Sequence, residues 1–215
     1  MNYIRKFENF EILLEGRYDS ITNKISSDVF NYWKKDFYDG KKESRFENTY
    51  YDKDIEVEVD ANISFIDGFD NFFVDGGVDE ETDYLEIRFE IDPNWLPGHF
   101  SEISMWLKDL VRHEIEHLTQ DQMSSSYNPT KHIDDDQFVR GLINMGALDR
   151  SDYFRLPKEV DANLQGMYYR AKKERRPFID VIMNYLNSQN ISQEDIENIL
   201  EIWRKRAKEL NLPKF

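Results

Sequence analysis

The chain has 215 residues, and none of them is cysteine. Disulfide bonds and thiolate metal ligands are therefore excluded, so a metal site in this protein must be built from histidine, aspartate or glutamate. Long hydrophobic runs are absent as well, and the first residues lack the pattern of a secretory signal peptide. We therefore expect no membrane partner and no secretion through a classical signal peptide.

Basic residues are few compared with acidic ones. The chain has 28 Lys and Arg but 43 Asp and Glu, which gives a net charge of −15. Because such a surface repels phosphate backbones, we expect no nucleic-acid partner. An inhibitor that mimics nucleic acid is a further interpretation, and it rests on net charge alone.

The apolar content is sufficient for a substantial core. Hydrophobic residues make up 40% of the chain and aromatic residues 14%. At this length we expect one domain at residues 16–215, whose last part, 178–215, is a C-terminal helical extension. An amphipathic segment at residues 1–15 precedes this domain.

Hydrophobic periodicity predicts the secondary structure. Strict alternation predicts strands at 55–66 and 84–91, which we expect to pair antiparallel. The residues between them, 67–83, are rich in glycine and aspartate and are predicted to form a loop or a long hairpin connection. Helical spacing predicts helices at 19–39, from 103 onward, at 136–147, 157–173 and 178–186, and from 192 through 210. The expected fold class is α+β, with a small antiparallel sheet packed on several helices.

Two of only four histidines lie in the segment His113-Glu114-Ile115-Glu116-His117. Residues four apart on a helix share one face, so both imidazoles can bind a single metal ion with Glu114 beside them. Zinc suits such a site, because a catalytic zinc ion acidifies a bound water and a nearby carboxylate can accept its proton. The HExxH pattern predicts His113 and His117 as zinc ligands and Glu114 as the general base of peptide hydrolysis.

A pattern with two free positions also arises by chance, so its surroundings matter. Leu107, Leu110, Val111 and Ile115 give the same helix a wide apolar surface, which indicates that the helix is buried. The histidines would then lie beside a buried stripe, where unpaired polar groups are unfavourable. A bound metal ion would remove that cost, which favours a metal site over coincidence.

A third ligand must come from elsewhere in the chain. Pro157 suits the first position of a helix and places Glu159 in the first turn, where a carboxylate also commonly stabilises the helix dipole. Asp161 is the nearest competitor for this ligand role. His132, in the polar segment 124–132, is a candidate ligand or a donor that stabilises the transition state. Further candidate donors are Tyr153, Tyr168 and Tyr169.

With these residues, the chain resembles the gluzincin metallopeptidases, in which a glutamate ligand on a later helix often lies in a Glu-x-x-Ala-Asp/Asn pattern. The segment Glu159-Val160-Asp161-Ala162-Asn163 matches that pattern. The resemblance implies a zincin-like fold, Zn²⁺ as cofactor, Glu159 as third ligand and Asn163 as the residue that orients a ligating histidine. It also implies that the strand at 84–91 is an edge strand, which binds an extended peptide or protein substrate by main-chain pairing. The alternative zincin pattern HExxHxxGxxH is not met, because Gln120 and Met123 replace its glycine and third histidine.

The N-terminal segment is similar to the capsid-targeting peptides of large tailed phages, which are cut after a Leu/Ile-x-Glu step. Here that step is Leu13-Leu14-Glu15, followed by Gly16. The resemblance implies removal of residues 1–15, association with a phage capsid, and a location in the host cytoplasm or the virion. An ordinary N-terminal helix is the alternative for this segment. The alternative to a peptidase is a non-catalytic virion or host-interaction protein with a structural or vestigial zinc site.

Overall fold

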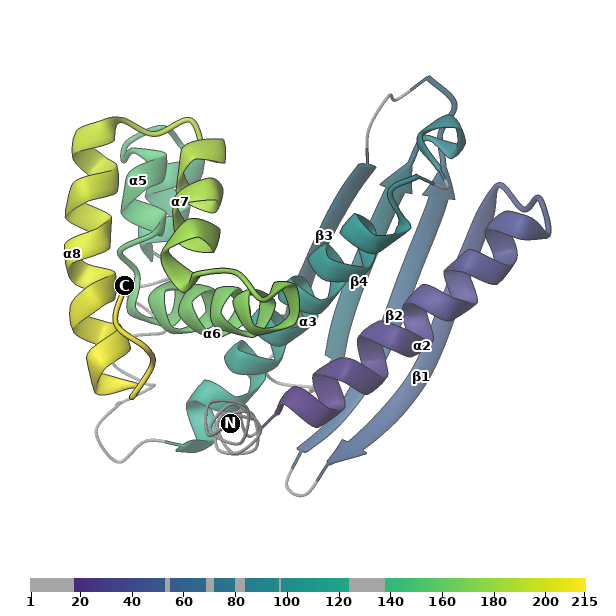
Figure 1. Ribbon diagram of the computed structural model, residues 1–215, viewed down its shortest axis with the longest axis horizontal. Helices are drawn as coiled ribbons and strands as arrows, with labels where there is room; N and C mark the ends of the chain where they lie inside the picture. Colours follow the sequence, from purple (N-terminus) through teal and green to yellow (C-terminus); the bar gives the residue numbers. More distant parts are fainter. Residues whose placement is uncertain (1–17, 53–54, 69–71, 80–83, 97, 124–137) are drawn as a thin grey trace, which may run out of the picture.

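The computed structural model describes residues 18–52, 55–68, 72–79, 84–96, 98–123 and 138–215 (Figure 1). The segment at 1–15 and His132 lie outside these residues. The α+β class is confirmed. The elements are, in order, α2 (Asp19–Tyr38), β1 (Glu43–Asp52), β2 (Ile55–Phe65), β3 (Phe72–Asp79), β4 (Tyr84–Ile91), the short 3-10 helix η1 (Pro93–Trp95), α3 (Phe100–Met123), α5 (Arg150–Tyr153), α6 (Pro157–Glu174), α7 (Phe178–Ser188) and α8 (Gln193–Glu209).

The sheet is mixed, and the expectation of a purely antiparallel sheet is wrong. In the described part of the chain its strand order is β1-β2-β4-β3. β1 pairs antiparallel with β2, and β3 pairs antiparallel with β4, but β2 and β4 run parallel. The strands predicted at 55–66 and 84–91 are thus neighbours, as expected, but they run parallel and not antiparallel. The reason is that β3 lies beyond β4 in the sheet, so that β4 returns into the position between β2 and β3.

The region predicted as a loop at 67–83 contains β3, which is an edge strand of the described sheet. β4 is interior, so the expectation that 84–91 forms the substrate-binding edge is wrong as well. Gly76 and Gly77 interrupt the alternation of apolar and polar residues in β3, so the strand was not recognised from the sequence. The structure shows why position 76 has no side chain. A methyl group on Gly76 would lie 3.0 Å from Leu110 Cδ2 of α3. Gly76 therefore allows α3 to pack closely against the edge strand β3.

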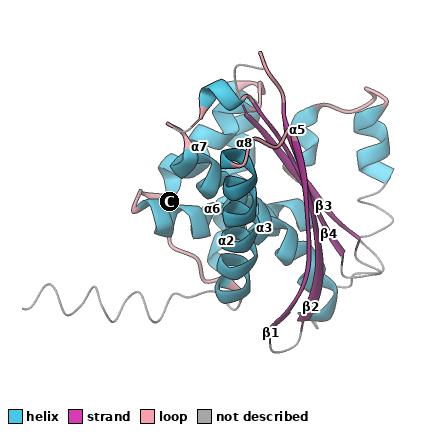
Figure 2. Cartoon of the chain, turned by 90° about the vertical axis from the view of Figure 1, so that its right-hand side faces the viewer, coloured by secondary structure: helices cyan, strands magenta, loops and turns pink. Residues whose placement is uncertain are grey.

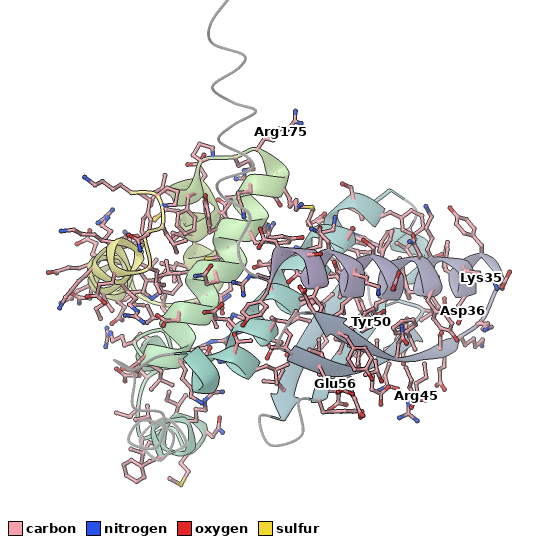
Figure 3. The ribbon with its side chains drawn as sticks, turned by 90° about the horizontal axis from the view of Figure 1, so that it is seen from below. Lys35, Asp36, Arg45, Tyr50, Glu56 and Arg175 are labelled. Atoms are coloured by element: carbon pink, nitrogen blue, oxygen red, sulfur yellow. The ribbon has the colours of Figure 1, made fainter. Side chains whose placement is uncertain are left out.

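Helices α2 and α3 lie along one face of the sheet, as the edge-on view in Figure 2 shows. Alternation along β2 and β4 turns apolar side chains toward these helices, among them Val57, Val59, Ala61, Ile63, Leu85, Ile87 and Phe89. Tyr50 of β1 also faces α2, where its hydroxyl donates to Asp28 Oδ2 at 3.0 Å. In Figure 3, Arg45 and Glu56 lie on the other side of the sheet, and both are exposed. The sheet is therefore covered by helices α2 and α3 on its apolar face.

The C-terminal helices enclose a second cluster of buried apolar side chains. This cluster includes Phe154, Leu164, Ile182 and Trp203, which come from α6, α7, α8 and the end of α5. Residues 138–144 are also helical, within the range predicted from the sequence, and Phe138 of this helix is 67% exposed. Within the described residues, no helix is both long and apolar enough to cross a bilayer. The two clusters meet where α6 packs against α3 (Figure 1).

Candidate metal centre

The two motif histidines lie in the second half of α3, where the helix is held against the sheet. Val111 and Ile115 are fully buried in the core and anchor the helix on its sheet side. His113 and His117 share the side that faces α6, and their Nε2 atoms are 3.1 Å apart. The helical spacing of four therefore brings both imidazoles to one point, as the sequence predicts.

Helix α6 brings Glu159 to the same point. Leu156 is the N-cap residue in an extended conformation and Pro157 occupies the first turn, so Glu159 projects from the beginning of the helix. Its side chain is completely buried. Glu159 Oε2 lies 3.5 Å from His113 Nε2, and Oε1 lies 3.5 Å from His117 Nε2. Residues more than 40 positions apart in the chain thus converge on one cluster.

A glycine makes this convergence possible. Gly166 of α6 lies where the helix crosses α3, and a methyl group there would approach Asp109 Oδ1 to 2.7 Å and the Asp109 main-chain oxygen to 3.1 Å. The same methyl group would lie 3.5 Å from His113 Cβ. A side chain at this position would require Asp109 and its main chain to shift, so Gly166 allows the two helices to approach closely beside the histidine.

The three side chains fit a metal ion in spacing and in chemistry. In tetrahedral zinc sites, bonds of about 2.0–2.1 Å place neighbouring ligand atoms about 3.3 Å apart. The two Nε2 atoms are 3.1 Å apart, and each lies 3.5 Å from one Glu159 oxygen, Oε2 for His113 and Oε1 for His117. With one ligand atom taken from each residue, the three atoms lie within 4.8 Å of one another, so a small approach of the side chains would complete the coordination. In addition, Glu159 Oε2 is buried and accepts no hydrogen bond from any residue that the structure describes, an unfavourable state for a carboxylate oxygen. The cluster can therefore hold a metal ion through two imidazoles and one carboxylate.

The electrostatics of the cluster keep Glu159 ionised. Burial alone would raise the pKa of its carboxyl group, but His113, His117 and Arg140 reverse that effect and lower the pKa to about 2. Burial likewise opposes the charged form of His113, yet the contact with Glu159 and the charge of Glu114 raise its pKa to about 9. At neutral pH, a metal ion that binds here therefore competes with a proton on His113.

Glu114 has a different environment from Glu159. Burial raises the pKa of its carboxyl group to about 7, and the negative charge of Glu159 adds to this effect, while His113 opposes it. Its Oε1 lies 4.0 Å from His113 Nε2, so it borders the cluster. A carboxylate whose pKa lies close to neutral pH suits proton transfer in both directions.

Arg140, which no sequence pattern indicates, contacts the cluster directly. Its guanidinium group forms an ion pair with Glu159 Oε1. The guanidinium carbon also lies 5.4 Å from the centre of the Tyr153 ring, a cation–π distance. Tyr153 is thus near the cluster, where burial raises the pKa of its hydroxyl group and the charge of Glu159 adds to this effect; its role as a donor stays a prediction. The available signal in the sequence was general: a buried carboxylate requires a cationic partner.

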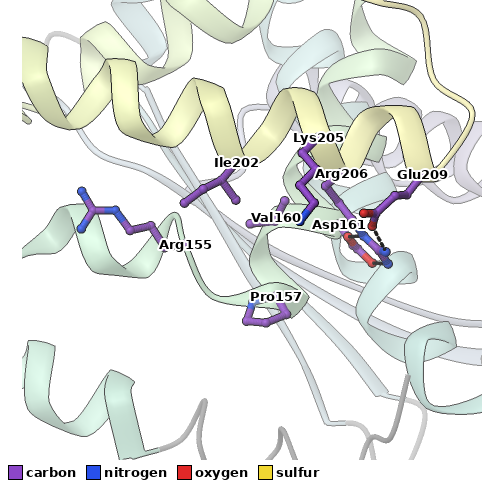
Figure 4. A pocket seen from close by; sticks show the side chains of 8 residues that line it. All are labelled: Arg155, Pro157, Val160, Asp161, Ile202, Lys205, Arg206 and Glu209. Atoms are coloured by element: carbon purple, nitrogen blue, oxygen red, sulfur yellow. Dashed lines mark hydrogen bonds and ion pairs between the residues drawn. The ribbon is translucent and has the colours of Figure 1, made fainter. Parts of the chain in front are cut away.

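Asp161, the competing ligand, lies away from the histidines. Both of its carboxylate oxygens accept hydrogen bonds from Arg206 of α8 at 2.6 Å. The pair borders a pocket of about 340 Å³ between α6 and α8 (Figure 4), which is lined by Arg155, Pro157, Val160, Asp161, Ile202, Lys205, Arg206 and Glu209. Residues two positions apart on a helix lie on nearly opposite sides. Glu159 therefore faces the histidines of α3, whereas Asp161 faces Arg206 of α8. The structure therefore brings Glu159, and not Asp161, to the cluster.

Asn163, Tyr168 and Tyr169, the remaining described candidates, all lie on α6. The amide of Asn163 donates to the main-chain oxygen of Glu159 at 2.7 Å within α6, and its predicted role in orienting a histidine stays a prediction. The Tyr168 ring packs against Phe178 in the C-terminal cluster. The Tyr169 hydroxyl donates to Asn23 of α2 at 2.5 Å.

Comparison with known proteins gave no match: no family model, no curated protein and no solved structure matches this chain. The arrangement of the side chains is therefore the basis for assigning a function.

Proposed function

We propose that this protein is a zinc-dependent peptidase in which His113, His117 and Glu159 hold the metal ion. The observation that carries the proposal is the approach of Glu159 from α6 to within 3.5 Å of both histidine Nε2 atoms of α3. Two imidazoles and a carboxylate are a common ligand set of catalytic zinc, which keeps a fourth position for water or substrate. The family resemblance of the HExxH segment points to the same chemistry.

In the proposed hydrolysis, the metal ligands and Glu114 have different roles. His113, His117 and Glu159 would hold the zinc ion, which would supply an acidified water and polarisation of the peptide carbonyl. Glu114 borders the cluster, accepts a proton from the attacking water and delivers it to the nitrogen of the leaving amine. Burial of Glu114 and Glu159 limits access of bulk water, so that the proton transfers occur between fixed groups.

The edge strand β3 is the best place for an extended peptide substrate. It packs on α3 through Gly76, beside Leu110, which precedes His113 by three residues. An edge strand presents main-chain amide and carbonyl groups at regular spacing, and a peptide can pair with them. This role replaces the one that the resemblance suggested for residues 84–91.

The test is the substitution Glu114→Gln in zinc-loaded protein. The amide keeps the size of the side chain but cannot accept the proton, so zinc content should stay at the wild-type level while cleavage of a mixed peptide library falls by several orders of magnitude. Glu116→Gln, on the same helix and outside the cluster, is the matched control and should keep both properties. Cleavage at the wild-type rate by Glu114→Gln would refute the mechanism.

A structural or vestigial zinc site in a virion or host-interaction protein is the second proposal. It would show zinc in the wild type without cleavage of any peptide in the library. A carboxylate beside the cluster with a pKa near neutrality favours the peptidase, because a structural site has no need for a base.

A further inference from the structure

Arg140 contacts only one of the two oxygens of the Glu159 carboxylate. Its guanidinium nitrogen pairs with Oε1, while Oε2 is buried and accepts no hydrogen bond from a described residue. The two oxygens of one carboxylate are therefore in different environments. Oε2 lies 3.5 Å from His113 Nε2 and is the oxygen that no described donor occupies, so it can turn to a metal ion without displacing Arg140.

Arg140 is itself held in place from a second side. Tyr153 lies under the guanidinium group at 5.4 Å, and this ring comes from α5 rather than from the helical residues 138–144 that carry Arg140. The side chain of Arg140 is 43% exposed, so its charge is accessible to water while its tip reaches a fully buried carboxylate. This arrangement holds a cation against Oε1 of the Glu159 carboxylate.

From this geometry we propose that Arg140 is a positioning residue that keeps Oε1 of Glu159 occupied, so that Glu159 binds the metal ion through Oε2 alone. This inference rests on the proposed metal site. Groups that hydrogen-bond to metal ligands orient them and commonly change metal affinity by 10- to 100-fold. A carboxylate bound through one oxygen leaves the fourth position open, whereas binding through both oxygens would add a ligand atom and crowd that position.

The opposite interpretation is that Arg140 and the metal ion compete for Glu159. Oε1 lies 3.5 Å from His117 Nε2, so a metal bound to that oxygen would meet the guanidinium charge. The two interpretations predict opposite signs for the effect of removing the arginine. Competition predicts tighter metal binding, and positioning predicts weaker binding.

The experiment compares wild type, Arg140→Met, Arg140→Lys and the control Arg150→Met, which removes an exposed arginine that hydrogen-bonds to Gln189. Zn²⁺ affinity is measured by competition with a chelating dye, and Co²⁺ alone is added as a spectroscopic probe. We expect a roughly 10- to 100-fold weaker affinity in Arg140→Met, partial recovery in Arg140→Lys and no change in Arg150→Met. The visible absorption of bound Co²⁺ should weaken in Arg140→Met, as the coordination number rises above four.

Unchanged affinity and unchanged Co²⁺ absorption in Arg140→Met, or tighter binding, would overturn the positioning role while leaving the metal site intact. A wild-type protein that binds neither Zn²⁺ nor Co²⁺ would overturn both the positioning role and the proposed function. Because Arg140 is partly exposed, we expect Arg140→Met to fold, and its circular dichroism spectrum checks this. If Arg140→Met fails to fold, Arg140→Lys provides the test. Affinity and Co²⁺ absorption at or near the wild-type level in Arg140→Lys would support a cationic positioning residue here. Tighter metal binding in Arg140→Lys would overturn the positioning role.

Discussion

Gly166 of α6 lies so close to Asp109 of α3 that a methyl group in its place would come within 2.7 Å of Asp109 Oδ1. The same contact is beside His113, so the packing of two helices and the geometry of the metal cluster depend on one glycine. Glu159 lies two turns before Gly166 on the same helix. A shift of α6 would therefore move Glu159 away from the histidines.

The first prediction concerns this crossing. Gly166→Ala should destabilise the protein by about 1–3 kcal/mol, since the methyl group meets the main chain of Asp109 and not only a flexible side chain. It should also weaken Zn²⁺ binding. Gly141→Ala is the matched control, because a methyl group there meets no atom within 4 Å among the described residues. Urea unfolding and zinc titration measure both effects, and equal behaviour of the two variants would contradict the account.

The second prediction concerns protons. The pKa of His113 is raised to about 9, so most molecules carry a proton on this imidazole at neutral pH. Zinc requires the neutral ring, and its binding should release about one proton from this residue near neutral pH. Apparent zinc affinity should therefore rise with pH and level off above the pKa of His113. Calorimetric titration in two buffers of different ionisation enthalpy measures the release, and identical heats in both would count against the prediction.

A third prediction concerns the pH dependence of hydrolysis. Glu114 acts as a base only when it is ionised, and burial raises its pKa to about 7. The rate should therefore fall as the pH drops through the pKa of Glu114, and the positive charge of a bound metal ion should place this transition at or below about 7. The pH profile of kcat/KM provides the measurement. A profile that shows no acidic limb over the whole pH range in which zinc stays bound would exclude Glu114 as the base.

The fourth prediction separates Asp161 from the metal site. Asp161→Asn should leave zinc content unchanged, because its carboxylate is bonded to Arg206 and not to the histidines. The loss of a charged double hydrogen bond should lower stability by about 1–2 kcal/mol, a modest amount because the Arg206 side chain is about one third exposed. Zinc analysis and urea unfolding of this variant distinguish the two roles. Loss of zinc would show that Asp161 is a ligand.

The sequence contained enough local information to predict the histidine pair. The spacing of four and the apolar stripe on the same helix place His113 and His117 on one face whatever the rest of the fold does. Glu159 could also be proposed as a ligand from the sequence, because Pro157 fixes the start of its helix. The choice between Glu159 and Asp161 depended on which side of α6 faces α3, and the pattern itself does not contain that information.

Two other features depend on tertiary structure. The glycines of β3 remove the alternation by which a strand is recognised, and Gly76 is small because Leu110 of α3 packs against it. The parallel pairing of β2 and β4 follows from the position of β3, which was not predicted as a strand. Arg140 meets Glu159 because the tertiary structure brings its side chain to the first turn of α6, so its role could not be predicted from spacing.

The most direct test of the central claim is the zinc content of purified protein after dialysis, by elemental analysis of wild type and Glu159→Ala. Glu159 is fully buried and lies 3.5 Å from both histidine Nε2 atoms, so its removal takes away the third ligand. The account predicts about one zinc ion per chain in the wild type and a clear loss in the variant. No zinc in well-folded wild type after reconstitution, or equal zinc in both proteins, would contradict the proposed site.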